Sequence, residues 1–172
     1  MVLLSARTRD HLRVLFTAPS VAEAERLLIE GCSENLPLVG DPTPLSLERV
    51  RFAVLRLSGG DLTRLAEAIR VAQTDWRDVL VAAGFGETSQ AHTTWQPRRL
   101  DPAIVADWAA GSAVLGIAFA LGESVEVTWG PAVGQVGTVV GIASLEPQAR
   151  YLVSITPDTR DEVYESSLRR AG

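Results

Sequence analysis

Residues 119–168 constrain the fold most, because this segment combines a regular alternation of apolar and polar residues with closely spaced turn formers. The alternation indicates strands with one buried face, since successive side chains of a strand point to opposite sides. Gly130-Pro131, Gly134 and Pro157 interrupt it at places where the chain can reverse direction. Closing the sheet on itself would bury its apolar face and remove its free edges, so we expect a small β-barrel. The predicted strands cover residues 125–127, 136–142, 151–155 and 162–164. In the second of them, Val136, Thr138, Val140 and Ile142 are expected to share the buried face.

The glycine-rich part of this segment, residues 122–142, has the sequence GESVEVTWGPAVGQVGTVVGI. It resembles the KOW motif, an SH3-like barrel element of ribosomal proteins and transcription elongation factors. The run FALGESVEV, residues 119–127, is also similar to the SH3-like barrel of nitrile hydratase β subunits. The resemblance implies an SH3-like fold but no single function, because small barrels host unrelated activities. KOW modules that bind RNA commonly carry Lys or Arg at the glycine turn, whereas this chain has Gln135 and Val136 there.

The remaining length and the composition favour a second, helical unit before the barrel. With 172 residues, of which 47% are hydrophobic, the chain can bury a sizeable core. The net charge is −5, and all 16 basic residues are arginine, a bias that we attribute to a GC-rich bacterial genome. An acidic chain repels the backbone of a nucleic acid on average unless its arginines cluster.

Cysteine usage and hydropathy predict a cytoplasmic protein without a membrane segment. Cys32 is the single cysteine and cannot form an internal disulfide, which suits a reducing compartment. The first ten residues lack the apolar core of a signal peptide. The longest apolar stretch, residues 113–121, is far shorter than the roughly 20 residues of a spanning helix.

Apolar residues spaced three and four apart predict a helical bundle over residues 1–85. Ser20 with Glu23 forms a potential capping box, which predicts a helix that ends at Gly31. The proline-rich segment 35–44 is expected to be a loop. The later helices are expected to begin after the N-cap residues Ser46, Asp61 and Asp75.

Residues 86–111 are predicted to be a linker that contains a short helix. The stretch 86–97 is polar and contains a proline, as linkers often do. Asp101-Pro102 then predicts a short helix over residues 103–110. The apolar run 113–119 is ambiguous between a strand and a buried helix, and we favour a strand that leads into a barrel over residues 112–172.

No group of residues in the sequence predicts catalysis, a metal site or a cofactor. Cys32 with His11 or His92 matches no signature of a cysteine enzyme, and the three residues offer no spaced pair of zinc ligands. Asp75 and Asp78 begin a helix, where carboxylates act as caps. The densest acidic group is expected to form a solvated edge. Its members are Asp158, Asp161, Glu162 and Glu165.

Exposed aromatic residues at a barrel rim are the strongest binding candidates, because such rings can anchor a peptide or stack on a base. The alternative is that each ring covers the end of a small core. A second candidate surface, for nucleic acid, consists of arginines near the N-terminus and after Trp95, whereas Arg169-Arg170 is expected to be a solvated tail. The rim candidates are Trp129, Gly130, Pro131, Tyr151 and Tyr164. The arginine candidates are Arg7, Arg9, Arg13, Arg98 and Arg99.

These features support three hypotheses about function. The first is a non-enzymatic interaction protein that binds another protein through the barrel rim or a groove of the bundle. The second is a factor associated with RNA or nucleoprotein, which uses the arginines. The third, an accessory subunit or chaperone of a metalloenzyme, rests on the resemblance to nitrile hydratase alone. Salt dependence separates the first two, because phosphate contacts weaken steeply as salt rises.

Overall fold

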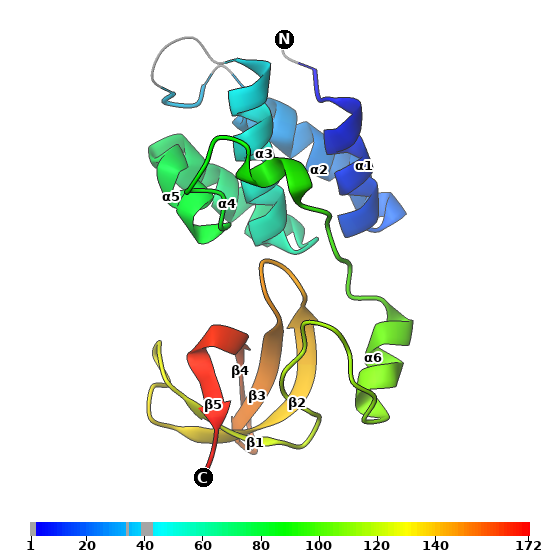
Figure 1. The fold of residues 1–172 in the computed structure, drawn as a ribbon, viewed down its shortest axis with the longest axis vertical. Coiled ribbons are helices and arrows are strands. Elements are labelled where there is room, and N and C mark those ends of the chain that lie inside the picture. The colour runs from blue at the N-terminus through cyan, green and yellow to red at the C-terminus, as the bar shows by residue number, and fades with distance from the viewer. Residues whose placement is uncertain (1–2, 34, 39–42) are drawn as a thin grey trace. The chain divides into compact units, whose positions relative to one another are not determined.

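The computed structural model describes residues 3–33, 35–38 and 43–172 and shows a mixed α+β protein. The chain divides into two compact units, Met1–Arg99 and Leu100–Gly172. The first consists of helices and the second of one helix and an antiparallel sheet (Figure 1). No helix within the described ranges is both long enough and apolar enough to cross a membrane.

The first unit is a helical bundle organised around its third helix. α3 contacts α1, α4, α5 and the short 3-10 helix η1, and it buries residues on almost every side, among them Phe52, Arg51 and Leu55. Burial on all sides explains why its apolar pattern is wider than the single stripe that a surface helix shows. The helices are α1 (Ala6–Leu15), α2 (Ala18–Gly31), α3 (Pro44–Ser58), α4 (Leu62–Thr74), α5 (Trp76–Ala82) and η1 (Ala91–Thr94).

The helix starts confirm two of the four predicted N-caps in this unit. Asp61 accepts from the amide of Arg64, and Asp75 accepts from the amide of Arg77. The prediction at Ser20 is wrong, because α2 begins two residues earlier with Pro19 in its first turn. The Ser46 prediction is shifted: Thr43 is the N-cap of α3, and Ser46 forms the other half of its capping box. Of the loop predicted over residues 35–44, residues 39–42 lie outside the described residues.

Helix ends in this unit are held by close packing and by arginines of α3. A side chain at Gly31 would have its Cβ only 2.3 Å from Ile69 Cγ2, so glycine allows α2 to approach α4. Arg51 Nε donates to the carbonyl of Cys32 at 2.9 Å, and Arg56 Nη1 donates to that of Ala83 at 2.9 Å. These bonds satisfy carbonyls at the ends of α2 and α5 that have no partner within the helix.

The segment predicted as a linker is partly wrong, because it packs into the helical core. His92 on η1 is fully buried, and Trp95 is buried beside Phe52 and Phe85. The division between the units falls between Arg99 and Leu100, so residues 86–99 belong to the helical unit. The polar composition of this segment concealed two rings that fill the space beside α3.

The second unit is a five-stranded antiparallel sheet with the strand order β4-β3-β2-β1-β5. Asp101 caps its helix as predicted and accepts from the amide of Ile104 at 2.9 Å. The buried core lies on one face of the sheet and includes Val125 and Val153, as the alternation predicted. For β2 the predicted face is wrong over most of the strand, because Val139 is buried whereas Val136 and Val140 are exposed. The elements are α6 (Pro102–Ala109), β1 (Ser124–Val127), β2 (Val136–Ser144), β3 (Arg150–Thr156), β4 (Thr159–Tyr164), η2 (Glu165–Ser167) and β5 (Leu168–Arg170).

The sheet is not closed, contrary to the predicted barrel. β4 pairs only with β3, and β5 pairs only with β1, so these two strands are the edges within the described residues 100–172. Residues 113–119 form turns and irregular backbone instead of the favoured strand. The strand next to β1 is instead β5, where a solvated tail was expected. In it, Arg169 pairs with Glu126 at 2.7 Å and Arg170 with Glu123 at 2.6 Å.

Candidate protein-binding site

A hollow of about 250 Å³ lies where the connection after β1 faces the edge strand β4. Its lining comes from the end of β1 and the β1–β2 connection, from β4 and from Ser167 of η2. We call this set of residues the edge hollow. Its lining consists of Val127, Trp129, Gly130, Pro131, Ala132, Asp161, Glu162, Val163, Tyr164 and Ser167.

Trp129 forms the exposed rim of the edge hollow and is 77% exposed, the most of any tryptophan in the chain. The connection that carries it is well fixed, since the amide of Gly134 donates to the carbonyl of Val127 at 2.7 Å. Gly130 has a φ of 102°, which a residue with a side chain rarely adopts. The buried side chain of Ala132 anchors the turn. The backbone therefore holds a large indole ring in solvent.

Tyr164 lies on the opposite wall, at the end of β4. Its neighbour across the sheet is Arg150, whose guanidinium carbon lies 5.8 Å from the centre of the Tyr164 ring. Arg150 is itself buried and forms an ion pair with Glu162, in which Nε and Oε2 are 3.1 Å apart. The arginine thus supports the ring by a cation–π contact and neutralises one acidic residue of the wall.

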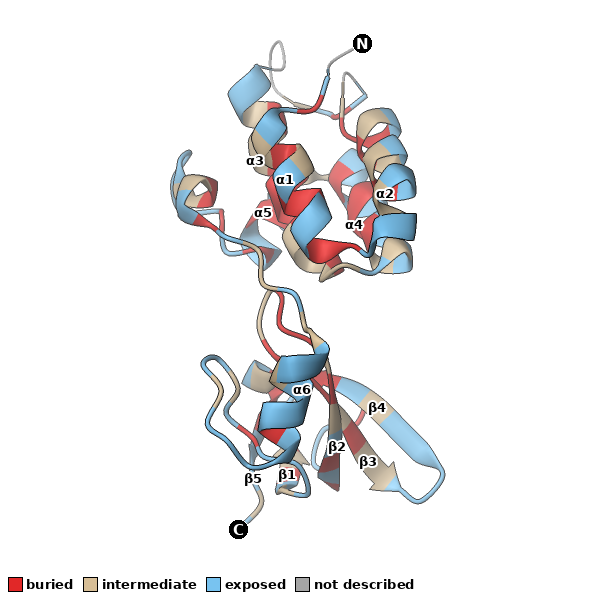
Figure 2. Cartoon of the chain, turned by 90° about the vertical axis from the view of Figure 1, so that its right-hand side faces the viewer, coloured by how far each residue is buried: buried red, intermediate tan, exposed pale blue. Residues whose placement is uncertain are grey.

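Asp161 gives the edge hollow an acidic wall. It is paired with Val153 across the sheet, on the same face as the buried Val163. Among the described residues, the Asp161 carboxylate has no ion pair and no hydrogen bond. Figure 2 shows that exposed residues dominate β4 towards its turn with β3. The hollow therefore combines aromatic rings with a carboxylate that is not neutralised.

Tyr151 does not belong to this rim, although the sequence placed it there. It is fully buried at the centre of the sheet unit, with its ring edge-on to Phe119 at 5.4 Å. Its hydroxyl donates to Glu165 at 2.7 Å and accepts from the amide of Ala118 at 2.9 Å. Burial, with the adjacent Glu165 carboxylate, raises the pKa of Tyr151 to about 12. Its role is to fix the irregular segment before β1 against the sheet.

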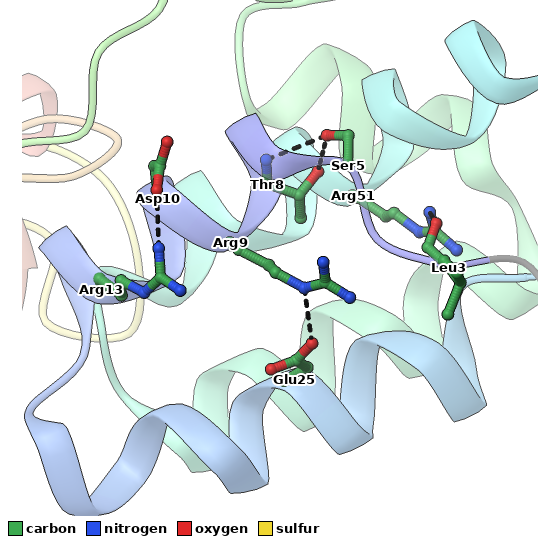
Figure 3. Close-up of polar contacts among 8 residues, drawn as sticks. All are labelled: Leu3, Ser5, Thr8, Arg9, Asp10, Arg13, Glu25 and Arg51. Atoms are coloured by element: carbon green, nitrogen blue, oxygen red, sulfur yellow. Dashed lines mark hydrogen bonds and ion pairs between the residues drawn. The ribbon is translucent and has the colours of Figure 1, made fainter.

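The arginines proposed for nucleic-acid binding are largely used within the helical unit. Arg9 pairs with Glu25 at 3.0 Å, and Arg13 pairs with Asp10 at 2.8 Å (Figure 3). Arg7 donates to the carbonyl of Thr93 and lies 5.2 Å from the ring centre of Phe52.

The two arginines after Trp95 differ in exposure. Arg98 is half-buried, whereas Arg99 is exposed and borders a shallow surface beside Arg13 and Phe16. The structure therefore does not bring the five arginines together into one basic surface.

The buried cysteine and histidines of the helical unit lie in apolar surroundings. Burial raises the pKa of the Cys32 thiol to about 12, so the reactive thiolate is scarce at neutral pH. Burial and the neighbouring Arg7 lower the pKa of His11 to about 4. His92, also buried, has its pKa lowered chiefly by burial. In the part of the chain that the structure describes, no three His, Cys, Asp or Glu residues are grouped so that they could hold a metal ion.

Compared with protein-family models, curated proteins and solved structures, the chain has no significant match in any of the three.

The residues of the edge hollow were only partly predictable. Trp129, Gly130, Pro131 and Tyr164 were identified as candidates because they are aromatic or lie at a turn. Asp161 was interpreted as part of a solvated edge, since its place on the core-facing side of β4 depends on the pairing register. The alternation of β4 was the one signal that could have separated Asp161 from its acidic neighbours.

Proposed function

We propose that this chain is a non-enzymatic protein-interaction module that binds its partner at the edge hollow. The sheet unit would be an SH3-like fold that is open along one side. The observation that carries the proposal is the exposure of Trp129, 77%, on a well-fixed turn that borders a hollow. Tryptophan and tyrosine are among the residues that most often dominate the binding energy of protein interfaces.

The free energy that burial of the Trp129 ring would supply supports a role of this ring in binding. Burial of about 150 Å² of indole surface against a partner would contribute about 4 kcal/mol. Tyr164 and Pro131 extend the apolar surface next to it. Trp129 does not belong to the buried core of the sheet unit, so its ring contributes little to the stability of the fold.

Capture of partners by the tagged full chain tests this proposal. Wild type is compared with Trp129→Ala and with Leu115→Ala, a control that removes another exposed apolar side chain, 85% exposed, outside the hollow. We expect Trp129→Ala to lose at least one partner that both wild type and Leu115→Ala retain after nuclease treatment. Equal capture by the three proteins would contradict the proposal. Partners that disappear with nuclease would instead favour the hypothesis of an RNA-associated factor.

A further inference from the structure

We propose, on the basis of the proposed function, that the edge hollow binds an extended, positively charged peptide segment that adds to β4 as a further strand. In this arrangement an apolar side chain of the peptide packs beside Val163 and Trp129, and a Lys or Arg pairs with Asp161. The partner is thus a protein with an exposed, unstructured cationic stretch.

The free edge of β4 is the first argument. β4 is six residues long and has a strand, β3, on one side only. The hollow lies along its other side, where a closed barrel would have its next strand. An extended segment placed there can form the main-chain hydrogen bonds of a sheet, a mode in which backbone pairing supplies affinity and side-chain pockets supply specificity.

The side-chain alternation of β4 predicts the spacing between the cationic and the apolar residue of the peptide. Asp161 and Val163 are two residues apart and share one face, and they pair with Val153 and Tyr151 of β3. A strand added beside them also presents every second side chain to that face. The cationic residue and the apolar anchor of the peptide are therefore expected two positions apart.

The net charge of the sheet unit favours a peptide of positive charge. The sheet unit, residues 100–172, contains nine acidic and four basic residues, so its net charge is −5, the charge of the entire chain. Three of its arginines already pair with carboxylates, Arg150 with Glu162 and the two of β5 with Glu123 and Glu126.

The fourth arginine, Arg160, pairs with Ser154 in the sheet and so lies on the face opposite Asp161. Asp161 consequently remains available for a cation. No basic residue lines the hollow to compete for it.

A second copy of the chain fits this edge less well. Symmetric pairing of two β4 strands would place the acidic residues of one copy beside those of the other, with a net charge of −5 on each sheet unit. Like charges across a strand pair destabilise it. The same acidity opposes a nucleic acid as the occupant.

Selection from a phage-displayed library of random peptides on the immobilised full chain tests the inference. We expect enriched peptides to carry Lys or Arg two positions from a bulky apolar residue. The most enriched peptide is then synthesised, and its Kd is measured with wild type, Asp161→Asn, Trp129→Ala and the control Asp107→Asn. Asp107 lies on α6, outside the hollow, and its replacement changes the net charge by the same amount.

Asp161→Asn is expected to weaken binding about five- to tenfold at low salt, and Asp107→Asn to change it less than about twofold. N-methylation of the peptide backbone at alternate positions should abolish binding in one register and leave it nearly unchanged in the other, since a strand directs every second amide to its neighbour.

Four results would overturn the inference: no enriched peptide, enrichment without basic residues, equal affinity of Asp161→Asn and wild type, or a dimer in sedimentation that Trp129→Ala dissociates. If capture of partners still depends on Trp129 in any of these cases, the proposed function stands and only the peptide mode fails. If Trp129→Ala affects neither capture nor peptide binding, both fail.

Discussion

The two units of this chain differ in net charge and in the exposure of their tryptophans. The helical unit contains twelve acidic and twelve basic residues, whereas the sheet unit holds the whole net charge of −5. In the helical unit, arginines donate to helix ends and pair with carboxylates, as Arg51 and Arg9 do. Its largest ring cluster, around Phe52, is buried, whereas the sheet unit exposes Trp129 beside an unpaired carboxylate. The first unit uses these residues for stability, whereas the second leaves Trp129 exposed and Asp161 unpaired, as the proposed binding role requires.

Removal of the central ring of the helical unit should have the largest effect on stability. Phe52 is fully buried, and its ring lies 4.4 Å from that of His11 and 5.7 Å from that of Trp95. Phe52→Ala should lower the free energy of unfolding by about 3–5 kcal/mol, because it leaves a cavity that the helices fill only in part. Urea denaturation followed by far-UV circular dichroism measures the loss.

The matched control for that experiment is Leu45→Ala on the same helix, where the side chain is 50% exposed. It should change the free energy of unfolding by less than about 1 kcal/mol. Similar losses for Phe52→Ala and Leu45→Ala would mean that the ring cluster does not stabilise the helical unit. The proposed difference between the two units would then not hold.

Acidification should be the next largest effect. Burial and Arg7 lower the pKa of His11 to about 4, against the opposing effect of Glu48 and Asp10. Between pH 6.5 and about 4 the unfolded state therefore binds a proton at His11 that the folded state does not, so stability falls as the pH falls through this range. The full shift corresponds to about 3 kcal/mol.

Denaturation curves recorded across this pH range measure the effect. His11→Phe keeps a ring of similar shape and should flatten the pH dependence of stability, although the lowered pKa of His92 leaves a residual slope of the same sign. An unchanged slope in His11→Phe would assign the acid sensitivity to other groups. A slope of the opposite sign in wild type would contradict the buried, neutral state of both histidines.

Removal of the hydroxyl should destabilise the protein more at Tyr151 than at Tyr164. Tyr151→Phe removes a bond to Glu165 and leaves the amide of Ala118 with one acceptor fewer, which should cost about 1–3 kcal/mol. Tyr164→Phe is the control, since the Tyr164 ring is half-buried at the hollow. It should cost less than about 0.5 kcal/mol. Thermal unfolding of both variants measures the difference. Equal losses of stability would contradict a stabilising role of the Tyr151 hydroxyl.

The sequence predicted the parts of the fold that depend on local chemistry. Asp61, Asp75 and Asp101 each begin a helix as expected, because an N-cap bond joins residues only two or three positions apart. The alternation likewise predicted the buried faces of β1 and β3, which carry Val125 and Val153, but it assigned the wrong face to β2, where Val139 is buried.

Apart from the helix starts predicted at Ser20 and Ser46, what failed depended on contacts between distant residues. Alternation shows which face of a strand is buried but not whether β4 and β5 meet, so closure of the sheet could not be derived from it. His92 and Trp95 lie in a polar stretch, and only the space beside Phe52 explains their burial. The same distinction applies to the candidate site. The sequence of the turn was enough to identify Trp129, whereas the position of Asp161 depends on how β4 pairs with β3.

The smallest effect on stability should come from the residue that matters most for the proposed function. Trp129→Ala should change the free energy of unfolding by less than about 0.5 kcal/mol, because the ring is 77% exposed and contributes little to the core. Trp108→Ala is the matched contrast: Trp108 is 5% exposed and donates through Nε1 to Phe119 at 2.8 Å, so its loss should cost about 3–5 kcal/mol. Urea titrations of both variants give the comparison. If Trp129→Ala destabilises the sheet unit as much as Trp108→Ala does, the ring serves the fold, and the contrast between a stabilising unit and a binding unit is lost.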